Sequence, residues 1–181
     1  MKRARNDKKG VLVWITGLPG SGKTTLAKTL HGLMKNNIPS VLVDGDAVRE
    51  IMGHDLGYNI KDRLANAYRI VKLNKLLTDH GLVVLCPTVS LFSEIHRWNK
   101  NNIENLIEIF IDVPMEVLIS RDQKGMYSAA VRGKKKNVRG INQKFDVPKK
   151  PHFTIRNHGD LDSFLKNAGM IKKMILRKMK S

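Results

Sequence analysis

The sequence predicts an α/β fold, in which a parallel β-sheet is covered by helices on both faces. Short apolar runs, such as "VLVWITG" at residues 11–17, are typical of strands buried on both faces. Between these runs lie stretches with apolar residues at helical spacing, as in "TTLAKTLHGLMKNN" at residues 24–37. Strands that alternate with helices predict parallel pairing through right-handed crossovers, and ligands in such sheets bind beyond the carboxyl ends of the strands.

The expected elements follow one another without a repeat or a convincing linker. Further helices are expected at residues 62–81, at 114–122, where Pro114 stands near the first position, and at 160–181, where Gly169 is expected to break or kink the helix. Strands are predicted at residues 11–17, 40–46, 82–89 and 106–113, with a short last strand at 152–157.

Length and composition indicate one domain, spanning residues 11–181, behind a basic tail at residues 1–10. A chain of 181 residues can bury one substantial core but is short for two ordinary domains. The single cysteine, Cys86, excludes an internal disulfide and a multi-thiolate metal site, as suits a reducing cytosol. No apolar run approaches the ~20 residues that span a bilayer. We therefore expect a cytoplasmic protein.

The net charge of +17 raises the question of nucleic-acid binding, but the distribution of the charge favours a local site for an anionic ligand. Residues 11–120 carry 11 basic and 11 acidic side chains. The excess lies in residues 1–10 (+4), 121–150 (+8) and 151–181 (+5). A neutral body with one basic central segment fits work on a polyanionic ligand. Ordinary solvated surface is the alternative, above all for the two termini.

The segment "GLPGSGKT", from Gly17 to Thr24, matches the phosphate-loop pattern at all of its positions. The glycines let backbone N–H groups wrap a β-phosphate at the start of the following helix. Lys23 can reach the β- and γ-phosphates, and the Thr24 hydroxyl suits Mg²⁺. The motif predicts a nucleoside triphosphate and Mg²⁺ but not the fate of the γ-phosphate, since GTPases, ATPases and kinases share it. The candidate ATP-binding residues here are Gly17, Gly20, Ser21, Gly22, Lys23, Thr24 and Thr25.

Two carboxylates follow the second predicted strand, in "VDGDAVRE". Asp44 and Asp46 lie on the same side of the chain if the strand stays extended. One can hold the magnesium shell, while the other accepts a proton from a hydroxyl that attacks the γ-phosphate. Arg49, three residues further on, could hold an anionic acceptor.

Five segments together resemble the adenylylsulfate kinases: "GLPGSGKTT", "VDGDAVRE", "DLGYNIKDRLAN", "RDQKGMYSAA" and "KNVRGI". They have the order and spacing of that family, and the resemblance covers about residues 11–157. It implies the P-loop nucleoside triphosphate hydrolase fold and a small-molecule nucleotide as substrate. The implied reaction is ATP-dependent phosphorylation of the ribose 3′-hydroxyl of adenylyl sulfate. Related enzymes are commonly dimers, so the resemblance also implies a homodimer, which nothing in the sequence supports independently.

The resemblance also implies roles for individual residues. Asp46 would be the catalytic base, with Lys23 beside the phosphates and with Asp44 and Thr24 at the metal. Arg121, which would also bind ATP, and the basic stretch 132–139 would form a mobile lid, around residues 121–150, over both nucleotides. The implied acceptor-binding residues are Asp46, Arg49, Tyr58, Arg63, Asn66, Val89, Ser90, Lys124, Val138 and Arg139.

The departures from the family pattern cluster on the acceptor side. Ser90 is followed by Leu91 instead of proline, and the arginines that normally come next are missing. Val138 replaces the aromatic residue of the family's Asn-Phe-Thr-Gly segment, which removes one face of the expected base sandwich. This pattern resembles the kinases of bacterial capsule clusters that act on cytidine diphosphoramidate. Adenylyl sulfate ranks first on the breadth of the family, and cytidine diphosphoramidate is a close second.

Two other classes of function compete with the kinase hypothesis. A nucleic-acid-binding module would use the basic termini and lid, but it has no need of "DGD" or "RDQKG". A bare NTPase switch would leave the acceptor-side arginines unexplained. The last helix, apolar on one face and basic around it, is expected to dock on its own domain or on a sister subunit, with membrane-surface contact as the alternative.

Overall fold

The computed structural model describes residues 9–122 and 125–180. It contains a five-stranded sheet in the order β2-β3-β1-β4-β5, with every neighbouring pair parallel. This sheet confirms the α/β class. The strands are β1 (Leu12–Gly17), β2 (Ser40–Leu42), β3 (Val83–Thr88), β4 (Leu106–Asp112) and β5 (Phe153–Arg156).

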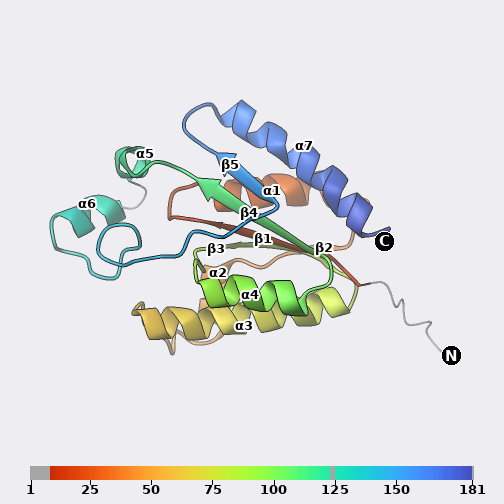
Figure 1. Ribbon diagram of the computed structural model, residues 1–181, viewed down its shortest axis with the longest axis horizontal. Helices are drawn as coiled ribbons and strands as arrows, with labels where there is room; N and C mark the ends of the chain where they lie inside the picture. The colour runs from red at the N-terminus through yellow and green to blue at the C-terminus, as the bar shows by residue number, and fades with distance from the viewer. Residues whose placement is uncertain (1–8, 123–124, 181) are drawn as a thin grey trace.

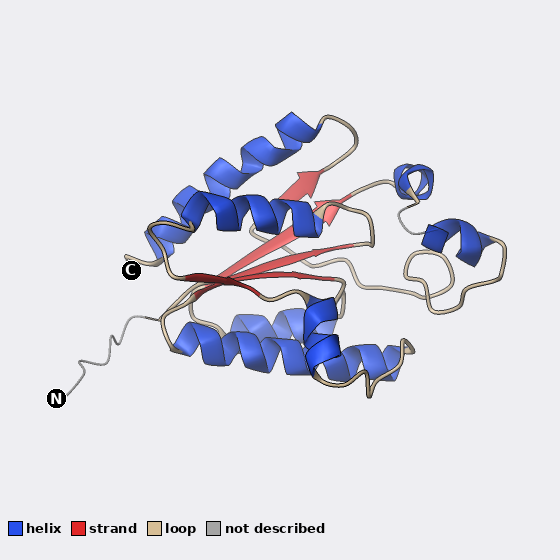
Figure 2. Ribbon diagram, turned by 180° about the vertical axis from the view of Figure 1, so that it is seen from behind, coloured by secondary structure: helices blue, strands red, loops and turns tan. Residues whose placement is uncertain are grey.

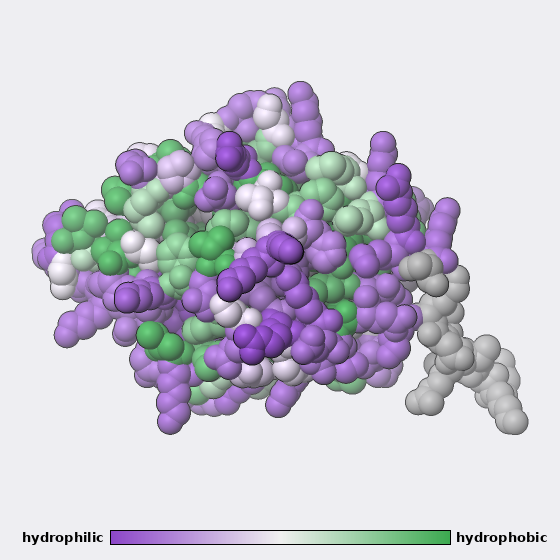
Figure 3. All heavy atoms as spheres, viewed as in Figure 1, coloured by the Kyte–Doolittle hydropathy of each residue, from purple (hydrophilic) through white to green (hydrophobic). Residues whose placement is uncertain are grey.

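Helices cover both faces of this sheet (Figures 1 and 2). The helices α1 and α7 lie on one face, and α2, α3 and α4 lie on the other, while α5 and α6 extend beyond the end of the sheet. Hydrophilic side chains cover most of the face seen in Figure 3, and apolar ones show near the end occupied by α6. The helices are α1 (Lys23–Met34), α2 (Gly45–Ile51), α3 (Ile60–Asp79), α4 (Ser93–Asn102), α5 (Met115–Arg121), α6 (Met126–Val131) and α7 (Leu161–Lys178).

The central strand β1 shows why the molecule has two layers of core. All six of its residues are buried. Because successive side chains point to opposite faces, Val13 and Ile15 pack in the cluster that includes residues of α1 and α7. Leu12 and Trp14 pack in the cluster on the α3 side. The continuous apolar run of β1 is therefore a consequence of burial on both faces.

Two sequence-based expectations about the elements are wrong. The second strand was expected to reach Asp46, but β2 ends at Leu42, and Asp44 is the N-cap of α2, with its carboxylate accepting the N–H of Asp46. Short polar side chains compete for backbone donors in this way and start helices. The helix α7 runs unbroken through Gly169, which faces open space, so its glycine costs some stability without ending the helix.

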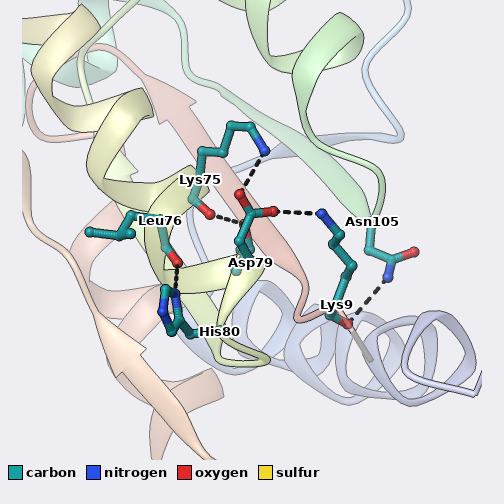
Figure 4. Close-up of polar contacts among 7 residues, drawn as sticks. Lys9, Lys75, Leu76, Asp79, His80 and Asn105 are labelled. Atoms are coloured by element: carbon teal, nitrogen blue, oxygen red, sulfur yellow. Dashed lines mark hydrogen bonds and ion pairs between the residues drawn. The ribbon is translucent and has the colours of Figure 1, made fainter. Parts of the chain in front are cut away.

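Surface ion pairs lie at the end of the sheet where the strands begin, away from their carboxyl ends (Figure 4). The Asp79 carboxylate binds Lys9 at 2.9 Å and Lys75 at 2.7 Å. The amide of Asn105 donates to the Lys9 carbonyl. All three charged groups are partly exposed, so these pairs connect Lys9, which precedes β1, to α3 with a modest gain in stability.

Two further features bear on the sequence-based expectations. The Cys86 side chain is fully buried in β3, and burial raises the pKa of its thiol to about 12, as expected for a small buried hydrophobe. Within residues 9–122 and 125–180, no helix has the length and apolar character needed to cross a membrane.

Candidate active site

The phosphate loop joins β1 to α1 in a conformation that favours glycine at several positions. Gly20 and Gly22 have φ values of 78° and 100°, in the left-handed region. A Cβ on Gly17 would lie 2.7 Å from the carbonyl oxygen of Ile111 on β4. The loop therefore stays closely packed against the carboxyl ends of β1 and β4, where a parallel sheet binds its ligands.

Lys23 occupies the first turn of α1 and points back into this loop. Its Nζ donates to the carbonyl of Leu18 at 2.8 Å, and the residue is only 8% exposed. Burial lowers the pKa of Lys23 to about 8, and the nearby carboxylates of Asp44 and Asp46 partly oppose this shift. The ammonium is thus close to the phosphate-binding amides but poorly solvated.

Asp44 and Thr24 form a pair that fits Mg²⁺. The Thr24 hydroxyl donates to Asp44 Oδ2 at 3.5 Å, while Asp44 Oδ1 accepts the N–H of Asp46 at 2.9 Å. Within the described part of the chain, no cluster of three or more His, Cys, Asp or Glu side chains could hold a metal ion. Mg²⁺ commonly binds one or two protein oxygens, several waters and the substrate phosphates, so a two-residue site is sufficient.

A cavity of about 460 Å³ extends from the phosphate loop across the carboxyl ends of β1 and β3. Thr88, Phe92 and the lid residues Lys135 and Lys136 also line it, and the sequence did not single out Thr88 or Phe92. Thr88 could have been found as the last residue of a buried strand. The predicted site residues that line this cavity are Gly20, Lys23, Thr24, Asp44, Asp46, Arg49, Tyr58, Arg63, Asn66, Val89, Ser90 and Val138.

Tyr58 is held at the mouth of this cavity by two arginines. The guanidinium carbons of Arg49 and Arg63 lie 4.8 and 5.1 Å from the centre of its ring. Arg63 also bridges two chain segments, because its Nε donates to the Tyr58 carbonyl at 2.8 Å and its Nη2 to the Asn137 carbonyl at 3.0 Å. The tyrosine is 55% exposed, so a ligand can reach part of it although both guanidinium groups lie over its ring.

The buried part of the cavity lining includes three uncharged polar side chains, those of Asn66, Thr88 and Ser90. Asn66, on α3, is 7% exposed, and its Oδ1 has no hydrogen-bond partner among the described residues. The hydroxyls of Thr88 and Ser90 are 2.7 Å apart. Because a buried polar atom without a partner is costly, Asn66 is suited to bind a polar group of a ligand.

Arg139 was expected to bind the acceptor, but the structure places it outside the cavity lining. It is 2% exposed, donates to the Leu91 carbonyl at 2.7 Å and lies 4.1 Å over the ring of Phe92. Burial lowers its pKa to about 10. The expected lid is thus divided, because residues 132–136 are exposed whereas Val138 and Arg139 are buried.

The remaining predicted residues lie at the donor side or outside the described chain. Arg121, at the end of α5, donates to the Gly20 carbonyl at 3.4 Å and to the Asn157 carbonyl at 3.1 Å. Ser21, within the loop, is buried, and Thr25 is exposed on α1 outside the cavity lining. Lys124 lies outside the described residues.

A phosphate loop at the carboxyl edge of a parallel sheet, beside a cavity with a carboxylate at its border, defines a P-loop protein that binds a nucleoside triphosphate. The family model of adenylylsulphate kinase matches residues 9–156. The chain belongs to the adenylylsulphate kinase family and is an ATP-dependent kinase that acts on a nucleotide.

Relatives and solved structures agree with this assignment. The cytidine diphosphoramidate kinase of Campylobacter jejuni is 40% identical over 76% of this chain and 81% of its own length. The adenylyl-sulfate kinase of Pseudomonas aeruginosa is 36% identical over 85% of this chain and 80% of its own. The Mycobacterium tuberculosis APS kinase CysC, solved in complex with AMPPNP and APS, superposes with a TM-score of 0.82. It is 30% identical, and the match covers 93% of this chain and 98% of that one.

Proposed function

We propose that this kinase transfers the γ-phosphoryl group of ATP to the ribose 3′-hydroxyl of cytidine diphosphoramidate. The observation that carries the choice of acceptor is the lining of the cavity. Tyr58 and Phe92 both line it, each with guanidinium groups over its ring, and Val138 stands where the family has a further aromatic residue. A pyrimidine has less stacking area than a purine and loses less when one aromatic partner is absent. The 40% identity to a cytidine diphosphoramidate kinase supports the same choice.

Adenylyl sulfate, which the sequence alone ranked first, is the second candidate acceptor. It is favoured by the adenylylsulphate kinase family match over residues 9–156 and by the conserved shape of the fold. Both acceptors present a ribose hydroxyl and an anionic group, which Arg49 and Arg63 can neutralise at the cavity mouth. The two candidates differ mainly in the base, so the acceptor assay must compare them directly.

The proposed chemistry is an in-line phosphoryl transfer. The 3′-hydroxyl oxygen attacks the γ-phosphorus, the bond to the β-phosphate oxygen breaks, and ADP leaves. Asp46 accepts the proton of the attacking hydroxyl, and Lys23 moves from the Leu18 carbonyl to the phosphate oxygens. Thr24 and Asp44 would hold Mg²⁺, which offsets the charge that develops on the phosphates when it is bound. The exposed lysines of the lid add positive charge over the same groups.

The test is a coupled ADP-release assay with each acceptor at equal concentration. We expect kcat/KM for cytidine diphosphoramidate to exceed that for adenylyl sulfate by about tenfold or more, which corresponds to about 1.4 kcal/mol of differential transition-state binding. A preference for adenylyl sulfate would overturn the choice of acceptor. ADP release that is equally fast without any acceptor would overturn the kinase mechanism itself. The Lys23→Ala variant controls for contaminating ATPases.

A further inference from the structure

Four consecutive carbonyl groups of the phosphate loop, from Leu18 to Ser21, are each bound by a side chain. Only one of the four side chains, Lys23, belongs to the loop itself. The others come from segments more than 100 residues further along the chain. The pairs are Lys23 Nζ to Leu18 at 2.8 Å, Tyr127 OH to Pro19 at 2.8 Å, Arg121 Nη1 to Gly20 at 3.4 Å and Asn157 Nδ2 to Ser21 at 2.9 Å.

Binding a carbonyl fixes the N–H of the next residue, because the peptide unit is planar and trans and its C=O and N–H point in opposite directions. A donor on the Pro19 carbonyl thus orients the N–H of Gly20, and a donor on the Ser21 carbonyl orients that of Gly22. The N–H of Ser21 is already used, since it donates to the Leu18 carbonyl at 3.1 Å.

The N–H groups of Gly20 and Gly22 are therefore the ones in this stretch that matter for binding phosphate. Neither donates to another group among the described residues. Both glycines have a positive φ, which a loop needs if successive N–H groups are to converge on one anion. Tyr127 and Asn157 hold the two peptide units whose N–H groups remain available for phosphate.

Both side chains are themselves firmly placed. Tyr127 is 1% exposed, and its backbone N–H donates to the Asp122 carboxylate at 2.7 Å. Burial raises the pKa of the Tyr127 phenol, so the hydroxyl keeps its proton and remains a donor. Asn157 is 7% exposed, and its backbone N–H donates to the Asp112 carbonyl at 3.1 Å, at the end of β4.

We propose that Tyr127 and Asn157 are positioning residues of the phosphate-donor site, which orient the N–H groups of Gly20 and Gly22 toward the β-phosphate of ATP. Tyr127 lies in α6, directly before the exposed lid residues 132–136, so it also joins the start of the lid to the phosphate loop. This inference rests on the use of ATP but not on which acceptor is phosphorylated.

The Tyr127→Phe variant removes only the hydroxyl, and its effect is measured by calorimetric titration with ADP in the absence of acceptor. We expect the Kd for ADP to rise about two- to tenfold, the range for one hydrogen bond. The KM for ATP should rise by a similar factor while kcat stays close to that of the parent enzyme. The matched control is Tyr68→Phe, which removes a hydroxyl bound to Glu94 on the surface of α3 and should leave the Kd unchanged.

The Asn157→Ala variant tests the second positioning residue. Its control is Asn102→Ala, because the Asn102 amide likewise donates to a backbone carbonyl, that of Trp98. Inorganic tripolyphosphate is the second probe, since it has phosphates but no adenine. Both Tyr127→Phe and Asn157→Ala should raise the Kd for tripolyphosphate and the Kd for ADP by similar factors. The proposal would be overturned by folded variants whose Kd for ADP is within twofold of that of the parent protein. It would also be overturned by variants that bind ADP more weakly but tripolyphosphate equally well.

Discussion

Raising the pH through the pKa of Lys23 should weaken nucleotide binding. The residue is 8% exposed, and burial lowers its pKa from the ordinary value of 10.5 to about 8. The ammonium form is the one that binds phosphate. Above the pKa, the free protein must take up a proton when a nucleotide binds, and this uptake reduces the observed affinity.

The size of the effect follows from the pKa. If bound phosphate keeps Lys23 charged, the Kd for ADP increases by the reciprocal of the protonated fraction of the free protein. Between about pH 7 and pH 9 this amounts to roughly a tenfold increase, with uptake of about 0.9 proton per ADP at pH 9. The stability of the nucleotide-free protein should change in the opposite direction. Between about pH 8 and pH 10.5 the unfolded chain binds more protons at Lys23 than the folded one, so this residue's contribution to stability rises with pH.

Calorimetric titration of ADP with Mg²⁺ in two buffers of different ionisation enthalpy measures both the Kd and the proton uptake. The Lys23→Met variant is the control, because it should bind weakly at every pH and show no uptake from this residue. A Kd that is constant over this range in the parent protein, or a net release of protons, would refute the assigned role of buried, partly deprotonated Lys23.

Three further predictions concern the acceptor side and α7. Replacing Asp46 with Asn should lower kcat by about 10²- to 10⁴-fold while ADP binding persists, and near-normal turnover would remove Asp46 as the base. Tyr58→Ala should raise the acceptor KM by about fivefold or more with little change in melting temperature, because the ring is 55% exposed; an unchanged KM would exclude stacking on it. Gly169→Ala should raise the free energy of unfolding by about 0.5–1 kcal/mol in urea titrations, since the added methyl group meets no atom within 4 Å; destabilisation would contradict a regular helix there.

Much of the donor site could be predicted from short stretches of sequence. The glycine spacing from Gly17 to Gly22 reflects local backbone requirements, and the apolar run before it reflects burial of β1 on both faces. The strand end carrying Asp44 was misjudged because the same carboxylate that was expected to point from a strand also caps a helix. The local sequence pattern therefore located the pair of carboxylates but did not predict the backbone conformation of the residues that carry them.

The acceptor side depended on contacts that no local pattern contains. Arg139 resembles a solvated lid residue in sequence, yet it is buried against Phe92 and the Leu91 carbonyl, about fifty residues earlier in the chain. Asn157 and Tyr127 reach the phosphate loop from still farther away. Their roles follow from which segments the folded sheet brings together.

The amino-acid sequence alone determined the class of fold, the nucleotide donor and the carboxylates beside it, because each depends on residues close together in the chain. Only the tertiary structure decided which side chains line the acceptor cavity and which hold the loop carbonyls. Tyr58, Ser90 and Val138 meet at one cavity because the parallel crossovers bring the carboxyl ends of different strands, and the segments after them, to the same edge of the sheet.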